Sequence, residues 1–229
     1  MPRSAPATSS LVTRLGRRLR IVLRREPQAA TQSAVAESAA GNPPQVEFVA
    51  YAEDRLLSGY VSLAADRLTD LLNEHQEFEL VDVFVQDLTG AGRQVATVTV
   101  ERDELLMVHA IGPRGDRGRR TRTRQHPVAI QIGPYHVRGY LHALPGSDAI
   151  AGFRRRRPMV PITDAWIEYV SGKTRQRRRV GTLIVNRQLV DWIVPAIDDE
   201  VEMPDIPLSA YPKGPLLKDF TGQVRLGRG

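Results

Sequence analysis

Leu57-Ser58-Gly59-Tyr60-Val61 recurs 80 positions later in the chain as Val137-Arg138-Gly139-Tyr140-Leu141. In both stretches inward and outward positions alternate, which is the period-2 pattern of a β-strand with one buried face. Each time, a glycine interrupts the apolar face. A glycine in that position, twice, indicates a sharply bent strand or the close approach of a neighbouring backbone, as in a small barrel.

Two further blocks repeat in the same order. Residues 78–85 match residues 160–167 with an offset of 82, and Val100-Glu101-Arg102 matches Val185-Asn186-Arg187 with an offset of 85. The offset drifts by only a few residues, so insertions fall between the repeated segments and the order of elements is kept. Three ordered matches predict a tandem duplication of one small domain.

Each copy is predicted to hold about five short strands, a number typical of small barrels. The fold class is therefore mainly β, with two tandem five-stranded barrel-like domains. The fourth and fifth strands are expected near residues 95–100, 104–110, 179–186 and 189–194. On the third strands the expected core positions are Val81, Val83, Val85, Ala165, Ile167 and Tyr169. The expected outward positions are Asp82, Phe84, Gln86, Asp164, Trp166 and Glu168.

The segment between the second and third strands differs between the copies. Residues 66–73 of the first copy predict a short helix with Asp66 as its N-cap. Residues 145–158 of the second copy, which contain Pro145-Gly146 and a run of arginines, predict a loop. Copies that share a core and differ in such connections divide the binding work between them.

The chain is accordingly divided into five parts. The ends are a basic amphipathic helix on a flexible linker and an extended C-terminal tail rich in Pro and Gly. Between them lie a first, acidic repeat, an Arg/Gly-rich linker and a second, basic repeat. In chain order the parts cover residues 1–45, 46–111, 112–127, 128–196 and 197–229.

The amphipathic helix is expected over residues 9–25, where leucines and valines fall on one helical stripe and arginines on the other. Such a helix can lie on an anionic membrane, dock on a partner or contact phosphate. It is also similar to an organellar transit peptide, being rich in arginine and free of acidic residues before Glu26.

Composition excludes several classes of protein. The absence of cysteine excludes a disulfide scaffold, a thiolate metal site and a cysteine nucleophile. No apolar run is long enough for a transmembrane helix. The histidines do not fall at ligand spacing, and no acid–base pair or nucleophile constellation is visible. We therefore expect a non-enzymatic cytoplasmic protein without metal or cofactor. A position at the membrane surface is the alternative location.

The formal net charge of +6 hides a strong segregation. Residues 46–111 hold 4 basic and 13 acidic side chains, whereas residues 112–180 hold 16 basic and 4 acidic ones. Nearly all the basic residues are arginine, whose planar fork suits phosphate and carboxylate. Asymmetry of this kind indicates a charged partner. A coding bias toward arginine accounts for the composition equally well.

The basic residues of the second copy and its flanks are the candidate polyanion-binding set, expected in a linker, an inter-strand loop and a hairpin. The aromatic Tyr140 shares a strand face with Arg138 and is suited to stack on a base. Phe84 and Trp166 recur as outward aromatics and are expected at an interface between repeats or chains. The full set is Arg114, Arg117, Arg119, Arg120, Arg122, Arg124, Arg138, Tyr140, Arg154, Arg155, Arg156, Arg157, Lys173, Arg175, Arg177, Arg178 and Arg179.

Gly59-x-x-x-Leu63, Leu80-x-Asp82-Val83 and Val100-x-Arg102-x-x-Leu105-x-x-Val108 resemble the two signature halves of Sm-like, SH3-type barrels. The second copy repeats them in Gly139, Ile162-x-Asp164-Ala165 and Val185-Asn186-Arg187-x-x-Val190-x-x-Ile193. The resemblance implies ring assembly and contact with RNA. In this chain the family's Asp-x-x-Met-Asn loop is replaced, and the glycine expected after the arginine is Asp103 or Gln188. The arrangement also resembles an uncharacterised bacterial family of duplicated domains, which implies no function.

Three functions follow from these patterns. The first is binding of RNA, DNA or another polyanion through the second repeat and its linker. The alternative is self-association into rings or filaments, in which the acidic repeat of one chain docks on the basic repeat of the next. The third is a membrane-surface adaptor that uses residues 9–25.

Overall fold

The computed structural model describes residues 22–23, 43–113, 118 and 121–197. The chain is mainly β, as the sequence predicts. The first repeat consists of β2 (Gln45–Tyr51), β3 (Arg55–Ser62), α1 (Leu68–Glu74), β4 (Glu77–Asp87), β5 (Gly92–Glu101), a 3-10 turn (Arg102–Glu104) and β6 (Met107–Ala110). The second consists of β7 (Arg124–Ile132), β8 (Tyr135–Ala143), α2 (Ala149–Arg155), β9 (Met159–Ser171), β10 (Thr174–Asn186) and β11 (Trp192–Pro195). A two-residue strand, β1 (Val22–Leu23), precedes both.

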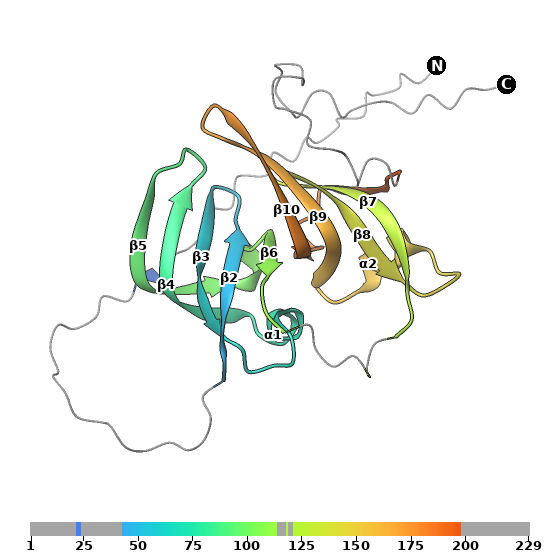
Figure 1. Cartoon of the computed structure of the whole chain (residues 1–229), viewed down its shortest axis with the longest axis horizontal. Coiled ribbons are helices and arrows are strands. Elements are labelled where there is room, and N and C mark those ends of the chain that lie inside the picture. The colour runs from blue at the N-terminus through green and yellow to red at the C-terminus, as the bar shows by residue number, and fades with distance from the viewer. Residues whose placement is uncertain (1–21, 24–42, 114–117, 119–120, 198–229) are drawn as a thin grey trace, which may run out of the picture.

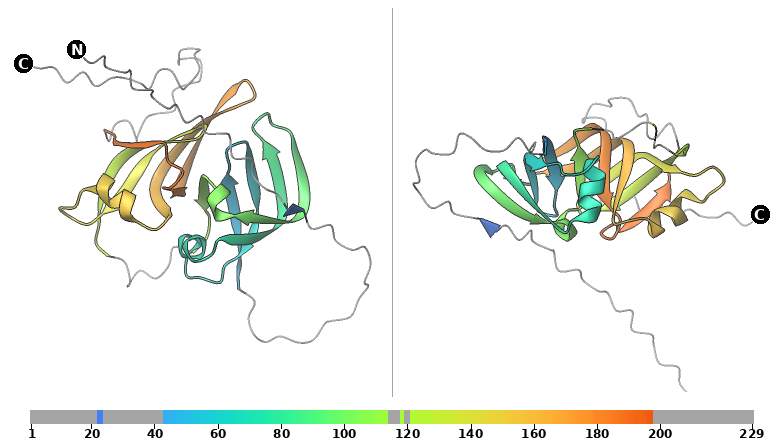
Figure 2. Two further views of the ribbon diagram at one scale, coloured as in Figure 1. Left: turned by 180° about the vertical axis from the view of Figure 1, so that it is seen from behind. Right: turned by 90° about the horizontal axis from the view of Figure 1, so that it is seen from below.

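The strands of both repeats join in one antiparallel sheet, which curls around two cores (Figures 1 and 2). Its order is β1-β5-β4-β3-β2-β6-β10-β9-β8-β7-β11. In each repeat the first strand pairs with both the second and the fifth strand. The repeats are connected where β6 of the first pairs with β10 of the second. The sequence does not predict this connection.

The repeated glycine sits where two strands cross most closely. A Cβ on Gly59 would lie 2.8 Å from the carbonyl oxygen of Val81, and one on Gly139 would lie 2.7 Å from Ile162 Cγ2 and 2.9 Å from the Thr163 oxygen. The strand pairing shifts register at both glycines. The residue facing each shift, Asp82 or Asp164, adopts a positive φ, 52° and 48° respectively. Each repeat is thus bent by a glycine opposite a β-bulge.

The bulge changes which side chains of β4 are buried. Phe78 and Leu80 face the core before it, and Val83 and Val85 face the core after it. Val81 is only partly buried, so the expectation that it belongs to the core is wrong. The extra residue of the bulge shifts the two-residue alternation by one position, which an unbroken period-2 pattern does not anticipate.

The two cores exchange residues across the connection. The core of the first repeat includes Met159 and Ile184 from the second, and the core of the second includes Tyr51 and Met107 from the first. Asn186, which is fully buried, donates from its amide to the carbonyl oxygens of Arg102 and Leu105 at 3.3 and 3.2 Å. The repeats are therefore packed as one unit.

Each repeat has one short helix. Helix α1 confirms the prediction for residues 66–73, but its N-cap position is Arg67 and no side chain caps it, so the assignment of Asp66 is wrong. Helix α2 replaces the loop expected over residues 145–158. Its N-cap is Asp148, whose carboxylate accepts from the backbone amides of Ile150 and Ala151 at 2.9 and 3.0 Å. That cap offsets the turn-like Pro and Gly before it.

The predicted terminal segments lie almost entirely outside the described residues. Of residues 9–25, only Val22 and Leu23 are described, and they form strand β1 rather than part of a helix. The linker and the C-terminal tail, with the exception of residues 43–45 and Ile197, also lie outside. Within the described part, no helix has the length and apolar character needed to cross a membrane.

Substitution of Gly139 by alanine is expected to lower the free energy of unfolding by about 1–3 kcal/mol, because the new Cβ meets backbone and core atoms closer than 3.0 Å. Gly152→Ala is the matched control. It lies in α2 with nothing within 4 Å of its added Cβ, so it should leave stability unchanged or raise it by about 0.5–1 kcal/mol. Urea unfolding measures both. Equal stability of the two variants would contradict the assigned role of Gly139.

Candidate functional site

Four of the candidate arginines lie on one outer face of the second repeat. Trp166 on β9 is paired with Arg138 on β8 and with Arg179 on β10. Arg177 and Arg175 are two and four positions before Arg179 on the same strand, so their side chains point to the same side of the sheet. We call Arg138, Trp166, Arg175, Arg177 and Arg179 the arginine–tryptophan face.

The indole of Trp166 is covered by guanidinium groups. The Arg177 Cζ lies 4.2 Å from the ring centroid and the Arg179 Cζ 5.7 Å from it. Contacts of this kind are worth about 0.5–1 kcal/mol at exposed sites. At the corresponding position of the first repeat, Phe84 instead covers the bare backbone of Gly92. The outward aromatic is common to both repeats, but its partners on the adjacent strands differ: Phe84 is paired with Ser58 and Gln94, whereas Trp166 is paired with Arg138 and Arg179.

Glu168 neutralises part of the positive charge. Its carboxylate accepts from Arg175 Nη2 at 2.7 Å and lies 3.2 Å from Arg177 Nε. The glutamate side chain is only 11% exposed, so the pair is partly shielded from solvent. Four arginines against one glutamate leave an excess of three positive charges on the face.

His136 lies next to Glu168 on β8 and is 4% exposed. Burial, with the positive charge of Arg138 as the second cause, lowers the pKa of His136 to about 4. The imidazole is therefore neutral at pH 7 and adds no charge to the face. Its ring packs at a tilt of 54° against that of Trp192 on β11, with the two centroids 5.9 Å apart.

A second basic group lies at the other end of β8, around α2. Arg156 is not free to bind a ligand there, because it donates to the carbonyl oxygen of His142 and its own carbonyl oxygen accepts from Arg187 Nε. Burial lowers the pKa of its guanidinium. The remaining members of this group are exposed: Arg122, Arg124, Arg154, Arg155 and Arg157.

The other candidates are dispersed. Arg178 points to the opposite side of β10 from Arg179, and its Nη1 lies 3.5 Å from the Tyr51 hydroxyl. Lys173 is exposed at the tip of the β9–β10 hairpin, and Tyr140 is half-buried beyond the Gly139 bulge. Arg114, Arg117, Arg119 and Arg120 lie outside the described residues. The hairpin predicted for residues 173–179 is formed by β9 and β10, but β10 begins at Thr174 and not near residue 179, so Arg175–Arg179 lie on the strand.

Phe84 lines a cleft of about 470 Å³ between the repeats. Glu47 and His109 of the first repeat face Arg178 of the second across it. Burial, followed by the charge of Arg178, lowers the pKa of His109. The cleft wall continues into three packed tyrosines, Tyr51, Tyr135 and Tyr169, with ring centroids 5.3–6.3 Å apart.

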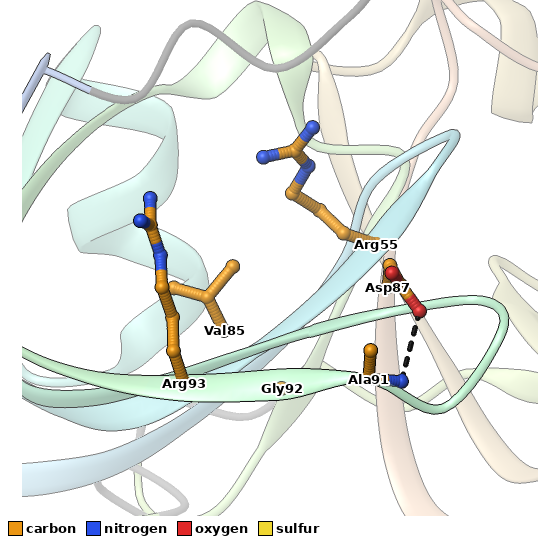
Figure 3. A pocket seen from close by; sticks show the side chains of 6 residues that line it. All are labelled: Arg55, Val85, Asp87, Ala91, Gly92 and Arg93. Atoms are coloured by element: carbon orange, nitrogen blue, oxygen red, sulfur yellow. Dashed lines mark hydrogen bonds between the residues drawn. The ribbon is translucent and has the colours of Figure 1, made fainter.

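The first repeat carries a smaller pocket of about 340 Å³ (Figure 3). The side chains of Arg55 and Arg93 extend from its wall on the same side, with Val85 between them. Arg55 is engaged by Asp54, whose two oxygens lie 2.9 and 2.6 Å from its Nε and Nη2. The Asp87 carboxylate accepts from the Thr89 hydroxyl, which is the largest cause of its lowered pKa.

Comparison with known proteins leaves the site to be judged on its geometry. No family model, curated protein or solved structure matches this chain. Within the described residues, no group of three or more His, Cys, Asp or Glu side chains is placed to hold a metal ion.

The sequence singled out every arginine of the arginine–tryptophan face but did not group them. It missed the part played by Glu168, whose position two residues after Trp166 on a strand is the signal that places both on one face. It also treated Arg178 as equivalent to its neighbours, although strand alternation alone separates it from Arg177 and Arg179.

The lowered pKa of His136 makes stability depend on pH. The neutral imidazole is favoured in the folded state, so the stabilisation is complete above about pH 6.5, the pKa of an unfolded histidine, and is lost as pH falls toward 4. The loss is on the order of 3 kcal/mol for this group. Urea unfolding at pH 7 and pH 4.5 should show a smaller difference for His136→Gln than for the native chain. The exposed His75→Gln is the control, and an equal effect of both variants would contradict the assignment.

Proposed function

We propose that this protein binds a polyanion, with single-stranded nucleic acid as the class that fits best, on the arginine–tryptophan face. The observation that carries the proposal is the indole of Trp166 flanked by Arg177 and Arg179 and paired on its other side with Arg138. The role is binding without catalysis. A cytoplasmic location is part of the proposal.

The chemistry of the face supports this class of ligand. Arginine forks donate to phosphate oxygens in pairs, and a planar aromatic ring offers a stacking surface to any base. Sequence-tolerant single-strand binders combine these two groups. Trp166 on β9 lies between the arginines of the two adjacent strands, β8 and β10, so one bound nucleic-acid strand can contact both kinds of group.

The carboxylate of Glu168 competes with a bound phosphate for two of the arginines. A phosphate that binds Arg175 or Arg177 must share that guanidinium with the glutamate 2.7 and 3.2 Å away. Affinity for phosphate is therefore moderated on one side of Trp166 and undiminished at the exposed Arg179 on the other. Arg179 is the arginine with the greatest expected effect on binding.

A salt titration of binding to a fluorescent single-stranded oligonucleotide tests the proposal. Arg179→Gln places on β10 the residue that the first repeat has at this position, Gln94. It should weaken binding at low salt and reduce the slope of log K against log salt by about 0.7, the value for one phosphate contact. Arg93→Gln, the same change on the exposed fourth strand of the first repeat, is the control and should leave the slope unchanged.

Trp166→Leu should cost about 1–3 kcal/mol of binding free energy, the value for one stacked base, and leave the salt slope unchanged. Its outward position keeps the core intact. Absence of binding by the native chain at low salt would overturn the proposal, and an equal loss in the Arg93 control would place the site elsewhere.

Self-association through sheet edges is the second candidate function. One observation favours it: inside the chain, the fifth strand of one repeat already pairs with the fourth strand of the other, as β6 with β10. The corresponding strands, β11 and β5, lie near the two ends of the sheet. A β11–β5 contact between chains would repeat the internal one and generate a head-to-tail ring or filament.

Sedimentation velocity over a range of protein and salt concentrations tests this second candidate. Backbone pairing between edges predicts association that increases with protein concentration and persists at 0.5 M salt, where a Debye length of roughly 4–5 Å screens exposed charges. Docking of the acidic on the basic repeat predicts association that salt abolishes. A monomer under all conditions would overturn both forms of assembly.

A further inference from the structure

Strands β5 and β10 are equivalent strands of the two repeats, related by the offset of 85. Leu183 and Ile184 of β10 therefore correspond to Val98 and Thr99 of β5. In the second repeat these two residues pair across the sheet edge with His109 and Val108 of β6. In the first repeat, Val98 and Thr99 pair with Leu23 and Val22 of β1.

Strand β1 thus occupies, on the first repeat, the register that β6 occupies on the second. Both pairings are antiparallel, and Val22 takes the place of Val108. β1 contributes two residues to the edge, whereas β6 contributes three to its pairing with β10. The pairing of β1 with β5 therefore has the same register as the pairing of β6 with β10, but it is shorter.

Pairing with β1 reproduces only part of the connection. Where the two repeats meet, a side chain of the first repeat also fills a pocket in the second, which we call the socket. In the second repeat, Tyr51 of the first packs against Tyr135 and Tyr169, and its hydroxyl meets Arg178. The positions that correspond to these three residues in the first repeat are Arg55, Asp87 and Arg93, and all three line the 340 Å³ pocket (Figure 3).

The pocket lies at the Gly92 end of β5, whereas β1 pairs at Val98 and Thr99 toward its other end. Among the described residues, the edge of the first repeat is thus paired with β1, and none from outside the repeat lines its socket. Within that part of the chain, the surface equivalent to the connection between the repeats is covered at the β1 end.

We propose that β1 is a displaceable cover on this edge, and that its release exposes the surface for β11 of a second copy of the chain. This rests on the second candidate function, self-association through sheet edges, and adds its regulation. By the offset of 85, Ile193 of β11 corresponds to Val108 of β6 and would take the place of Val22 opposite Thr99.

The chemistry of the socket fits the same partner. The residue of β7 that corresponds to Tyr51 is Gln131, by the pairing of Val128 and of Phe48 with the repeated glycines. The amide oxygen of Gln131 is an acceptor to which an arginine such as Arg93 can donate. A tyrosine at this position would instead require an apolar socket, like the one that holds Tyr51. The apolar socket of the second repeat thus suits a tyrosine, and the charged socket of the first repeat suits a glutamine.

A reversible lock on β1 tests the proposal. The chain has no native cysteine, so Val22→Cys with Thr99→Cys introduces the only two thiols, at positions directly opposite each other in the β1–β5 pair. Cross-strand partners are separated by about 4.5–5.5 Å between Cα atoms, within the range of a disulfide. Mass spectrometry establishes the cross-link, and sedimentation velocity compares the oxidised and reduced protein.

The complementary variant is Val22→Pro, which removes a backbone donor and disfavours strand pairing. Val22→Thr, which keeps the β-branch and the donor, is its control. Because apparent affinity falls with the fraction of molecules whose edge is open, Val22→Pro should associate roughly tenfold or more tightly than the native chain. The oxidised lock should stay monomeric, and reduction should restore native association.

Three results would overturn the inference. If the cysteines do not cross-link, the β1–β5 register is wrong. If the native and the locked chain associate equally, assembly stands but β1 does not control it. If neither the native chain nor Val22→Pro associates at any concentration, the inference and the assembly proposal fail together.

Discussion

The close approach of Gly59 and Gly139 to the facing strand is the constraint on which the rest of the structure depends. At each glycine the backbone carbonyl opposite lies less than 3.0 Å from where a Cβ would be, so no other residue allows the strands to cross there. Asp82 and Asp164 take up the extra length in a left-handed conformation. Together these residues bend each repeat around its core, and the bend is made twice because the domain is duplicated.

The same bulge sets which side chains face outward beyond it. Trp166 and Glu168 follow Asp164 on β9, and their orientation places them among Arg138, Arg177 and Arg179 on the outer side of the sheet. In the first repeat the equivalent alternation brings Phe84 over Gly92 instead. A shared backbone geometry therefore presents two different surfaces, one aromatic and neutral, the other aromatic and cationic.

The duplication also explains why the sheet has unequal ends. The connection between the repeats pairs the edge of β10 with β6, and among the described residues the equivalent edge of β5 is paired with the two residues of β1. Unpaired strand edges promote association unless they are covered. Binding of polyanion on an outer face and association through edges use different surfaces, so the two proposals are compatible and separately testable.

Local patterns in the sequence were sufficient for the mainly β class, the bent glycine strands of the two repeats and helix α1, since each depends on residues near one another in the chain. They were insufficient for Val81, where one bulge residue reverses the alternation, and for α2, where a single Asp148 cap outweighs turn-like neighbours. They also could not connect β6 to β10, because this contact joins strands of different repeats whose pairing no local pattern encodes. Glu168 was not grouped with Arg175 and Arg177 because the predicted hairpin did not fix which residues of its two strands face each other. The sequence determined the two repeats and their charges; the tertiary structure decided how the repeats share one sheet, because strand partners are chosen by packing across the whole chain.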